Sequence, residues 1–229
     1  MLISVVVPTY NEAGSLPELA GRLFAALQEA QLEGELVVVD DGSPDGTGDL
    51  AEELARRYPI RVLHRPARLG LASAVLEGMA RSQGEVLVVM DADLSHPPEV
   101  VPRLVAPLLA GQADLAVASR YIPGGDVSHW PWTRRFVSWG ANRLARLIVP
   151  VRDATSGFFA VRREVVEGAS LNPIGFKIGL EVMARGQYRR FVEVPYTFED
   201  RRYGRSKFGL REVFHYLRQL LALLRSRRR

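Results

Sequence analysis

The sequence predicts an α/β fold, with a mainly parallel sheet that carries helices on both faces and a terminal amphipathic helix. Two observations predict the sheet. Short apolar runs alternate with stretches of helical periodicity through the first half of the 229-residue chain. Polar clusters follow three of those runs, as expected where strands end at a ligand crevice. A third observation, apolar residues at helical spacing near the C-terminus, predicts the terminal helix.

The predicted elements of the first half follow the order of a doubly wound sheet. The predicted strands are apolar runs of five or six residues: Leu2–Val7, Glu35–Val39, Ile60–His64, Val86–Met90 and Asp114–Ala118. The predicted helices between them run from Ser15 to about Leu32, from about Gly46 to Arg57, from Leu69 to Ser82 and from Pro98 to Leu109. The first has a capping-box signature, Ser15-Leu16-Pro17-Glu18. Such alternation predicts parallel strands with right-handed crossovers.

The sequence changes character after Ser119. A Gly- and Pro-rich loop, Tyr121–Trp132, precedes further predicted elements: a helix at Arg134–Ile148, a strand at Thr155–Val161, a helix at Ile178–Arg185, a strand at Phe191–Val194, a charged loop at Phe198–Lys207 and a helix at Leu210–Leu224. No repeat or low-complexity linker separates the halves. We therefore expect one domain over residues 1–207, followed at 208–229 by a helix with a basic tail.

Composition narrows the function classes. The absence of cysteine excludes disulfides and Cys-based metal or nucleophile sites. No secretory leader or bilayer-spanning segment is recognised, which predicts a cytosolic protein or one on a membrane surface. The net charge of +4 favours anionic partners. Of the 30 Lys and Arg residues only Lys177 and Lys207 are lysines, so these two places indicate a need for a compact ammonium.

Two aspartates follow the predicted strand Val86–Met90, with one residue between them. Asp91 and Asp93 thus stand at the carboxyl end of a buried strand, where ligands of open α/β sheets gather. Neighbouring carboxylates favour a cation between them, and Mg²⁺ takes one or two carboxylates and completes its shell with phosphate and water. The pair indicates a metal–diphosphate site. A helix N-cap at Asp93 or Ser95 also explains these residues without a metal.

Polar clusters also follow the first two predicted strands. They are Pro8-Thr9-Tyr10-Asn11-Glu12 and Asp40-Asp41-Gly42-Ser43-Pro44-Asp45-Gly46. Neither contains a G-x-G-x-x-G or G-x-x-x-x-G-K-[ST] phosphate loop, which argues against a dinucleotide oxidoreductase and a P-loop NTPase. A nucleotide would instead be held by carboxylates on its base and ribose and by a metal on its diphosphate. A plain turn explains the second cluster equally well.

Segments spread along the chain form a familiar combination. They are Val6–Glu12, Val39–Thr47, Arg68–Leu71, Asp91–His96, Ser119–Tyr121, Ser138–Asn142, Asp153–Phe158 and Arg201–Lys207. Together they resemble the inverting, metal-dependent family 2 glycosyltransferases with the GT-A fold. The segments of the second half resemble, more narrowly, the dolichyl-phosphate or polyprenyl-phosphate mannose synthases.

This resemblance implies a role for each matching residue. The implied nucleotide-sugar ligands are Pro8, Tyr10, Glu12, Val39, Asp41, Asp91, Ala92, Asp93, Lys177, Arg201 and Lys207. The implied lipid-phosphate ligands are Arg120, Arg134, Ser138 and Arg205. Asp91, Asp93 and Ser95 would hold Mg²⁺ or Mn²⁺, and Asp93, Arg120 and Arg134 would be catalytic.

The implied reaction transfers mannose from GDP-mannose to a polyprenyl (dolichyl) monophosphate with inversion. A phosphate monoester already carries about −1.5 to −2 charge at pH 7, so it needs no general base to become a nucleophile. Glucosyl transfer from UDP-glucose to the same lipid class is the close alternative. A non-enzymatic module that binds anionic membranes or nucleic acid is another, but it leaves the aspartates at the strand ends unexplained. We therefore expect no nucleic-acid partner.

The terminal helix indicates a membrane surface as a further partner. Its apolar face comprises Leu210, Val213, Phe214, Leu217, Leu220, Leu221 and Leu224, and basic residues surround it. Packing of this face on the protein's own sheet fits the same spacing. A second interface candidate comprises Trp130, Trp132 and Trp139 with Arg134, Arg135, Arg143 and Arg146. We expect a peripheral protein on the cytoplasmic face of a membrane, and a separate membrane-anchoring subunit stays open.

Overall fold

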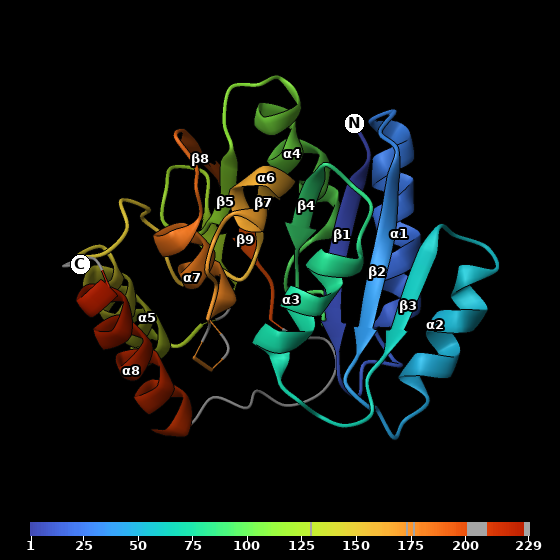
Figure 1. Ribbon diagram of the computed structural model, residues 1–229, viewed down its shortest axis with the longest axis horizontal. Helices are drawn as coiled ribbons and strands as arrows, with labels where there is room; N and C mark the ends of the chain where they lie inside the picture. The colour runs from blue at the N-terminus through green and yellow to red at the C-terminus, as the bar shows by residue number, and fades with distance from the viewer. Residues whose placement is uncertain (129, 173, 176, 201–209, 227–229) are drawn as a thin grey trace.

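The computed structural model describes residues 1–128, 130–172, 174–175, 177–200 and 210–226 (Figure 1). A seven-stranded sheet forms its centre, in the order β3-β2-β1-β4-β7-β5-β8. Its strands are β1 (Ile3–Thr9), β2 (Gly34–Asp40), β3 (Ile60–His64), β4 (Val86–Val89), β5 (Leu115–Ser119), β7 (Phe159–Arg162) and β8 (Phe191–Pro195). The pairs β1–β2, β1–β4, β2–β3 and β5–β8 are parallel, so the predicted mainly parallel sheet is confirmed.

Both faces of the sheet are buried because successive strand residues point to opposite sides. In β1, Val5 and Val7 join one hydrophobic cluster with α1 and α4, whereas Val6 joins another with α3 and α7. The first cluster lies under α1 (Leu16–Glu29), α2 (Thr47–Ala55) and α4 (Val101–Leu109), and the second under α3 (Leu71–Arg81), α6 (Arg163–Glu167) and α7 (Ile178–Arg185). The sheet therefore lies between two helical layers, as the α/β pattern predicts.

The capping box predicted at Ser15–Glu18 is wrong. Ser15 makes no side-chain cap bond, because its backbone is already helical and its hydroxyl donates back to the Glu12 carboxylate at 3.1 Å. Glu18 instead pairs with Arg22 one turn later, at 3.0 Å. Two further helices begin later than predicted. Helix α3 begins at Leu71 and not at Leu69, and a 3₁₀ turn, η1 (Pro98–Val100), precedes α4.

The second half departs further from the prediction. The strand expected at Thr155–Val161 begins only at Phe159, and β7 runs antiparallel to both of its neighbours, β4 and β5. Residues 155–158 form a loop before β7. A second, two-stranded sheet pairs β6 (Asp126–Val127) with β9 (Thr197–Phe198).

Helices α5 (Trp132–Ala145) and α8 (Leu210–Ser226) lie side by side at one end of the molecule (Figure 1). The Tyr216 hydroxyl donates to the Ala141 carbonyl at 2.7 Å. Tyr216, Gln219, Leu220 and Leu223 are buried, so α8 packs on the domain. Of the apolar face predicted for this helix, however, Val213, Phe214, Leu217, Leu221 and Leu224 are exposed. Among the described residues, no helix combines the length and apolar character needed to cross a membrane.

Candidate active site

Three parallel strands end beside one another, and their following loops form the nucleotide side of the candidate site. In the sheet, Thr9 is opposite Asp40 and Val6 is opposite Val89. The polar clusters after β1 and β2 and the aspartates after β4 therefore share one edge of the sheet, as predicted.

The turn after β4 holds the carboxylate pair in a strained conformation. Leu94, between Asp93 and Ser95, has φ = +63°, which an L-residue with a bulky side chain rarely adopts. The Asp93 carboxylate accepts a hydrogen bond from the Ser95 backbone N–H at 3.0 Å. Asp93 is buried, whereas Asp91 is partly exposed. One carboxylate is thus fixed inside the turn and the other faces outward beside it.

Three observations fit this turn to a divalent cation. Two carboxylates lie one residue apart, Asp91 is open to a ligand, and Ser95 Oγ is buried without a hydrogen-bond partner among the described residues. No group of three or more His, Cys, Asp or Glu with metal-binding geometry exists in the described part of the chain. A pair of aspartates completed by phosphate and water is the arrangement that Mg²⁺ accepts.

His96 positions Asp91. The Asp91 backbone N–H donates to His96 Nδ1 at 3.0 Å, so a neutral ring carries its proton on Nε2, which lies 4.0 Å from Asp91 Oδ2. Burial lowers the pKa of His96, although the two aspartates oppose this, and the ring stays neutral at pH 7. The ring stacks on Phe158, with 5.0 Å between centroids. His96 therefore ties the aspartate turn to the loop before β7.

At the nucleoside end, Asp41 is buried and its carboxylate is already engaged. Asp41 Oδ1 accepts from Arg65 Nη1 at 2.6 Å and from the Leu69 N–H at 3.0 Å, while Oδ2 accepts from the Gly70 N–H at 2.8 Å. This anchors the loop before α3. The same loop places the Arg68 guanidinium 4.4 Å from the centre of the Tyr10 ring.

A buried ion pair lies on the other side of the site, at the end of β5. Arg120 Nε and Nη2 each contact one oxygen of Asp153 at 2.7 Å, and the Arg120 backbone N–H donates to the same carboxylate at 3.0 Å. Burial alone raises the pKa of Asp153, but Arg120 outweighs it and the pKa lies below the ordinary value. Both charges are fixed at pH 7.

Arg134 is brought close to this pair by an aromatic side chain. Its guanidinium carbon lies 3.9 Å from the centre of the Trp130 ring, and that of Arg120 lies 5.4 Å from the same ring. Arg134 also pairs with Asp200 at 3.2 Å, where both side chains are partly exposed. Ser138, one turn further along α5, accepts a hydrogen bond from the Tyr121 hydroxyl at 2.8 Å. The residues predicted to bind a lipid phosphate therefore gather around Trp130 and the start of α5.

Lys177 joins the two sides of the site. It is the residue before α7, and its ammonium donates to the Thr155 carbonyl at 2.9 Å. Burial lowers its pKa to about 8, assisted by Arg120 and opposed by Asp153 and Asp91. A compact cation thus lies within electrostatic reach of the buried ion pair and of the aspartate turn.

The sequence matches glycosyl transferase family 2 over residues 4–168. The chain belongs to this family. It is 48% identical, over 98% of its length, to a dolichol-phosphate mannosyltransferase from Pyrococcus furiosus, and it spans 64% of that protein. It is 45% identical, over 90% of its length, to a polyprenol monophosphomannose synthase from Mycolicibacterium smegmatis, of which 80% is covered. Among solved structures it resembles glucosyl-3-phosphoglycerate synthase from Mycobacterium tuberculosis in complex with Mn²⁺, UDP and phosphoglyceric acid, at 27% identity and a TM-score of 0.66, covering 98% of this chain and 78% of that one.

Membership of glycosyl transferase family 2 makes the chain a glycosyltransferase and excludes the non-enzymatic module. It also confirms the predicted fold.

The predicted nucleotide-sugar ligands differ in how far they are exposed. Tyr10, Glu12 and Asp91 are partly exposed at the strand ends, as is Pro8 within β1. Val39 and Ala92 have side chains buried in the two cores, and Val39 lies in β2 between β1 and β3. Arg201, Arg205 and Lys207 lie outside the described residues.

Sequence reasoning gave Asp153, His96 and Arg68 no role in this family 2 site, and it assigned Trp130 to a membrane interface instead. Asp153 and His96 fix the positions of other site residues, Trp130 lies against two arginines, and Arg68 covers Tyr10. Asp153 and His96 stand in segments that carry the family resemblance. Asp153, however, contacts Arg120, more than thirty positions earlier, and His96 folds back to contact the backbone of Asp91. Only the three-dimensional arrangement identifies such partners.

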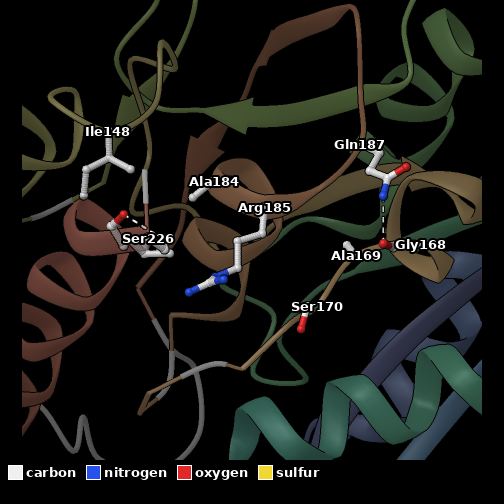
Figure 2. A pocket seen from close by; sticks show the side chains of 9 residues that line it. Ile148, Gly168, Ala169, Ser170, Ala184, Arg185, Gln187 and Ser226 are labelled. Carbon is white, nitrogen blue, oxygen red and sulfur yellow. Dashed lines mark hydrogen bonds between the residues drawn. The ribbon is translucent and has the colours of Figure 1, made fainter. Parts of the chain in front are cut away.

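One cavity of this glycosyltransferase lies away from the residues of the candidate site. Figure 2 shows a cavity of about 310 Å³ lined by Ile148, Gly168, Ser170, Arg185, Gln187 and Ser226, among others. Its Gln187 side chain donates to the Gly168 carbonyl at 2.7 Å. None of the predicted site residues lines it, so we assign no role in transfer to this cavity.

Proposed function

We propose that this enzyme transfers mannose from GDP-mannose to a polyprenyl monophosphate, with inversion at the anomeric carbon. The names of its relatives support the sugar and the lipid class. The observation that carries the proposal is the opposition of charge across the site. A carboxylate turn suited to a metal–diphosphate lies on one side, and a basic aromatic cluster suited to a second phosphate lies on the other.

The donor would bind along the ends of β1, β2 and β4. Tyr10 and Glu12 would contact the nucleoside, and Asp41 would shape its pocket through the loop that it anchors. Asp91, Asp93 and Ser95, directly or through water, would hold Mg²⁺ or Mn²⁺. When bound, this ion neutralises the charge that develops on the departing diphosphate. Metal-bound structural neighbours support a divalent ion in this fold.

The acceptor would bind at Arg134 and Ser138, and Lys177 would face the diphosphate of the donor. Its phosphate oxygen is already ionised, so the protein must place two anions close together rather than remove a proton. Arg134 neutralises the acceptor, and Ser138 donates its own O–H to it while accepting from Tyr121. Arg120 contributes charge from beneath Trp130 while Asp153 holds it in place. Attack from the acceptor side, opposite the diphosphate, inverts the anomeric carbon.

A lipid acceptor calls for a membrane-facing surface, and we assign this to α5 and α8. Large apolar side chains on these helices and just after α5 are exposed: Trp132, Phe136, Trp139, Leu144, Leu147, Phe214, Leu217 and Leu221. Amphipathic helices that expose aromatic and aliphatic residues beside arginines bind in the plane of a membrane interface. The enzyme would therefore work as a peripheral protein on the cytoplasmic face, and a separate anchoring subunit stays a prediction.

Thermal-shift measurements with GDP and UDP, each with and without Mn²⁺, test the donor. Stabilisation by GDP that requires Mn²⁺ supports mannosyl transfer. Stabilisation by UDP in place of GDP would favour the glucosyl alternative. Radiolabelled mannose transfer from GDP-mannose to a short-chain polyprenyl phosphate then tests the reaction itself.

A further inference from the structure

A groove lies along the C-terminal half of α5, next to the acceptor side of the site described above. It encloses about 400 Å³ and is lined by Tyr121, Trp139, Asn142, Arg143, Arg146 and Arg152. Half of the lining side chains are arginines, and two are aromatic. Among the residues that the structure describes, no acidic side chain lines the groove.

The three arginines of the groove differ from many others in the chain. Arg22, Arg65, Arg120, Arg163 and Arg185 each pair with a carboxylate. Arg143, Arg146 and Arg152 are exposed and make no ion pair with any residue in the described ranges. Three like charges that converge on one hollow repel one another, and an anion between them relieves this repulsion. Arginine forks bind phosphate oxygens in a two-pronged geometry.

The walls of the groove are fixed from within. The Tyr121 hydroxyl donates to Ser138 Oγ at 2.8 Å, and Asn142 Nδ2 donates to the Ser138 carbonyl at 3.1 Å. Asn142 Oδ1 accepts from the Thr155 N–H at 3.0 Å, and the Arg152 N–H donates to Glu193 at 3.0 Å. The backbones that carry the arginines are therefore held in place before any ligand binds.

The groove adjoins the proposed acceptor site through Tyr121 and Ser138, but its arginines lie far from Arg134. Arg134 is in the first turn of α5, and Arg146 follows the last residue of the same helix. At 1.5 Å per residue, about 18 Å of helix separates them. One phosphate monoester cannot bridge that distance, so the groove would take a second anion.

We propose that this groove binds the phosphate of an anionic membrane lipid, distinct from the acceptor lipid. Leu144 and Leu147 are exposed next to Arg143 and Arg146 at the end of α5 and just after it, and Trp139 is exposed at the groove itself. Apolar side chains that enter the interface thus alternate with cations at headgroup depth, which suits a phosphate attached to acyl chains. The inference rests on the membrane face of the proposed function. It assigns the groove a role in orienting the enzyme on an anionic surface.

Vesicle co-sedimentation of the full chain tests the proposal, with phosphatidylcholine vesicles with and without phosphatidylglycerol. The variant Arg143→Gln/Arg146→Gln/Arg152→Gln should lose about a hundredfold in affinity for the anionic vesicles, at about a factor of five for each arginine. The matched control is Arg56→Gln/Arg57→Gln/Arg81→Gln, which removes the same charge from exposed positions on α3 and after α2. The control should bind like the unmodified enzyme. Equal losses in both variants would overturn the proposal, because net charge alone would then explain binding.

A second variant separates a built site from diffuse attraction. Arg143→Lys/Arg146→Lys/Arg152→Lys keeps every charge but removes the forks, and it should still lose about tenfold in affinity. Unchanged vesicle binding by this variant would overturn the proposed lipid site.

Inorganic phosphate at constant ionic strength provides the free-anion comparison. If phosphate alone perturbs Trp139 fluorescence while anionic lipid gives no gain in binding, the groove takes a free anion and not a lipid. Mannosyl transfer to a water-soluble, short-chain acceptor should be unaffected in the variants. If the unmodified enzyme itself shows no such transfer, the proposed function is contradicted and the proposal for the groove is not.

Discussion

Arg120 and Asp153 form a buried, two-pronged ion pair, with both nitrogen–oxygen distances at 2.7 Å. Arg120 follows β5 and Asp153 precedes β7, so the pair joins two strands that run in opposite directions. The fork of Arg120 is therefore occupied by Asp153, and its guanidinium carbon lies 5.4 Å from the centre of the Trp130 ring, on which Arg134 also lies. We regard Arg120 as a positioning residue, and Arg134 as the arginine open to the acceptor.

Replacement of Asp153 by Asn should therefore destabilise the protein strongly. Removing one partner leaves the other charge buried without compensation, which costs about 3–5 kcal/mol of unfolding free energy. Urea denaturation measures this loss. The double variant Arg120→Met/Asp153→Leu provides the control, because replacing both charges with apolar groups recovers much of the stability. Full activity in that double variant would contradict a role for the Arg120 charge in transfer.

The same pair should make stability sensitive to acid. The pKa of Asp153 is lower in the folded protein than its ordinary value of 3.8, so the ionised form favours folding. This contribution is fully present above pH 3.8 and is lost as the pH falls through the lower, folded pKa. Denaturation midpoints measured from neutral pH downward should show the difference between the unmodified enzyme and Asp153→Asn shrinking only in that acidic window. A constant difference at all pH values would contradict the linkage.

The first half of the fold was predictable because its signals are local. Apolar runs such as Val86–Val89 are bounded by turn residues, and the two aspartates stand directly after the strand. The second half depends on partners that are distant in sequence. Gln219 is buried because its side chain donates to the Lys177 carbonyl at 3.1 Å, and a hydrophobic pattern assigns such a residue to the surface. Most of the apolar face predicted for α8 is therefore exposed, and a neighbouring face, which includes Tyr216 and Gln219, packs on the domain.

The direction of β7 illustrates the same limit. A buried apolar strand such as Phe159–Arg162 has the same pattern whether it runs parallel or antiparallel to its neighbours. The contacts of Asp41 are another case. Its position after β2 correctly predicts a place at the site, but the loop that it holds, through Leu69 and Gly70, starts almost thirty residues later.

The aspartate turn gives a metal prediction. Asp91→Asn and Asp93→Asn should each abolish metal-dependent turnover of GDP-mannose and leave the fold intact, because these carboxylates are compensated only when a metal binds. Loss of the Mn²⁺-dependent thermal shift with GDP is the readout that does not depend on activity. Ser95→Ala should raise the Mn²⁺ concentration needed for that shift, since it removes the buried hydroxyl that has no partner among the described residues. Undiminished turnover in either aspartate variant would remove the assignment.

The two faces of α8 should respond differently to substitution. Leu220→Ala on the packed face should cost about 2–5 kcal/mol of unfolding free energy, since it opens a cavity in the core. Phe214→Ser/Leu217→Ser/Leu221→Ser on the exposed face should leave the melting temperature nearly unchanged and weaken binding to anionic vesicles. Thermal denaturation and co-sedimentation of the same samples measure both. Deleting the whole helix cannot separate these effects, because the deletion removes Tyr216 and Leu223 from the core. Vesicle binding that survives in the triple variant would place the membrane contact elsewhere.

Lys177 should give the donor site a pH dependence of its own. In the enzyme without ligands its pKa is lowered to about 8, chiefly by burial, so the ammonium is charged below that pH and neutral above it. If it binds the nucleotide diphosphate, kcat/KM for GDP-mannose should fall about tenfold between pH 7 and pH 9, in proportion to the charged fraction. Lys177→Arg keeps its charge throughout this range, so its profile should be flat. It should also run about tenfold below the unmodified enzyme at pH 7, because a planar fork replaces the ammonium that donates to the Thr155 carbonyl. If the Lys177→Arg profile still falls above pH 8, another group is titrating. If this variant also matches the rate of the unmodified enzyme at pH 7, the choice of lysine at this position has no catalytic consequence.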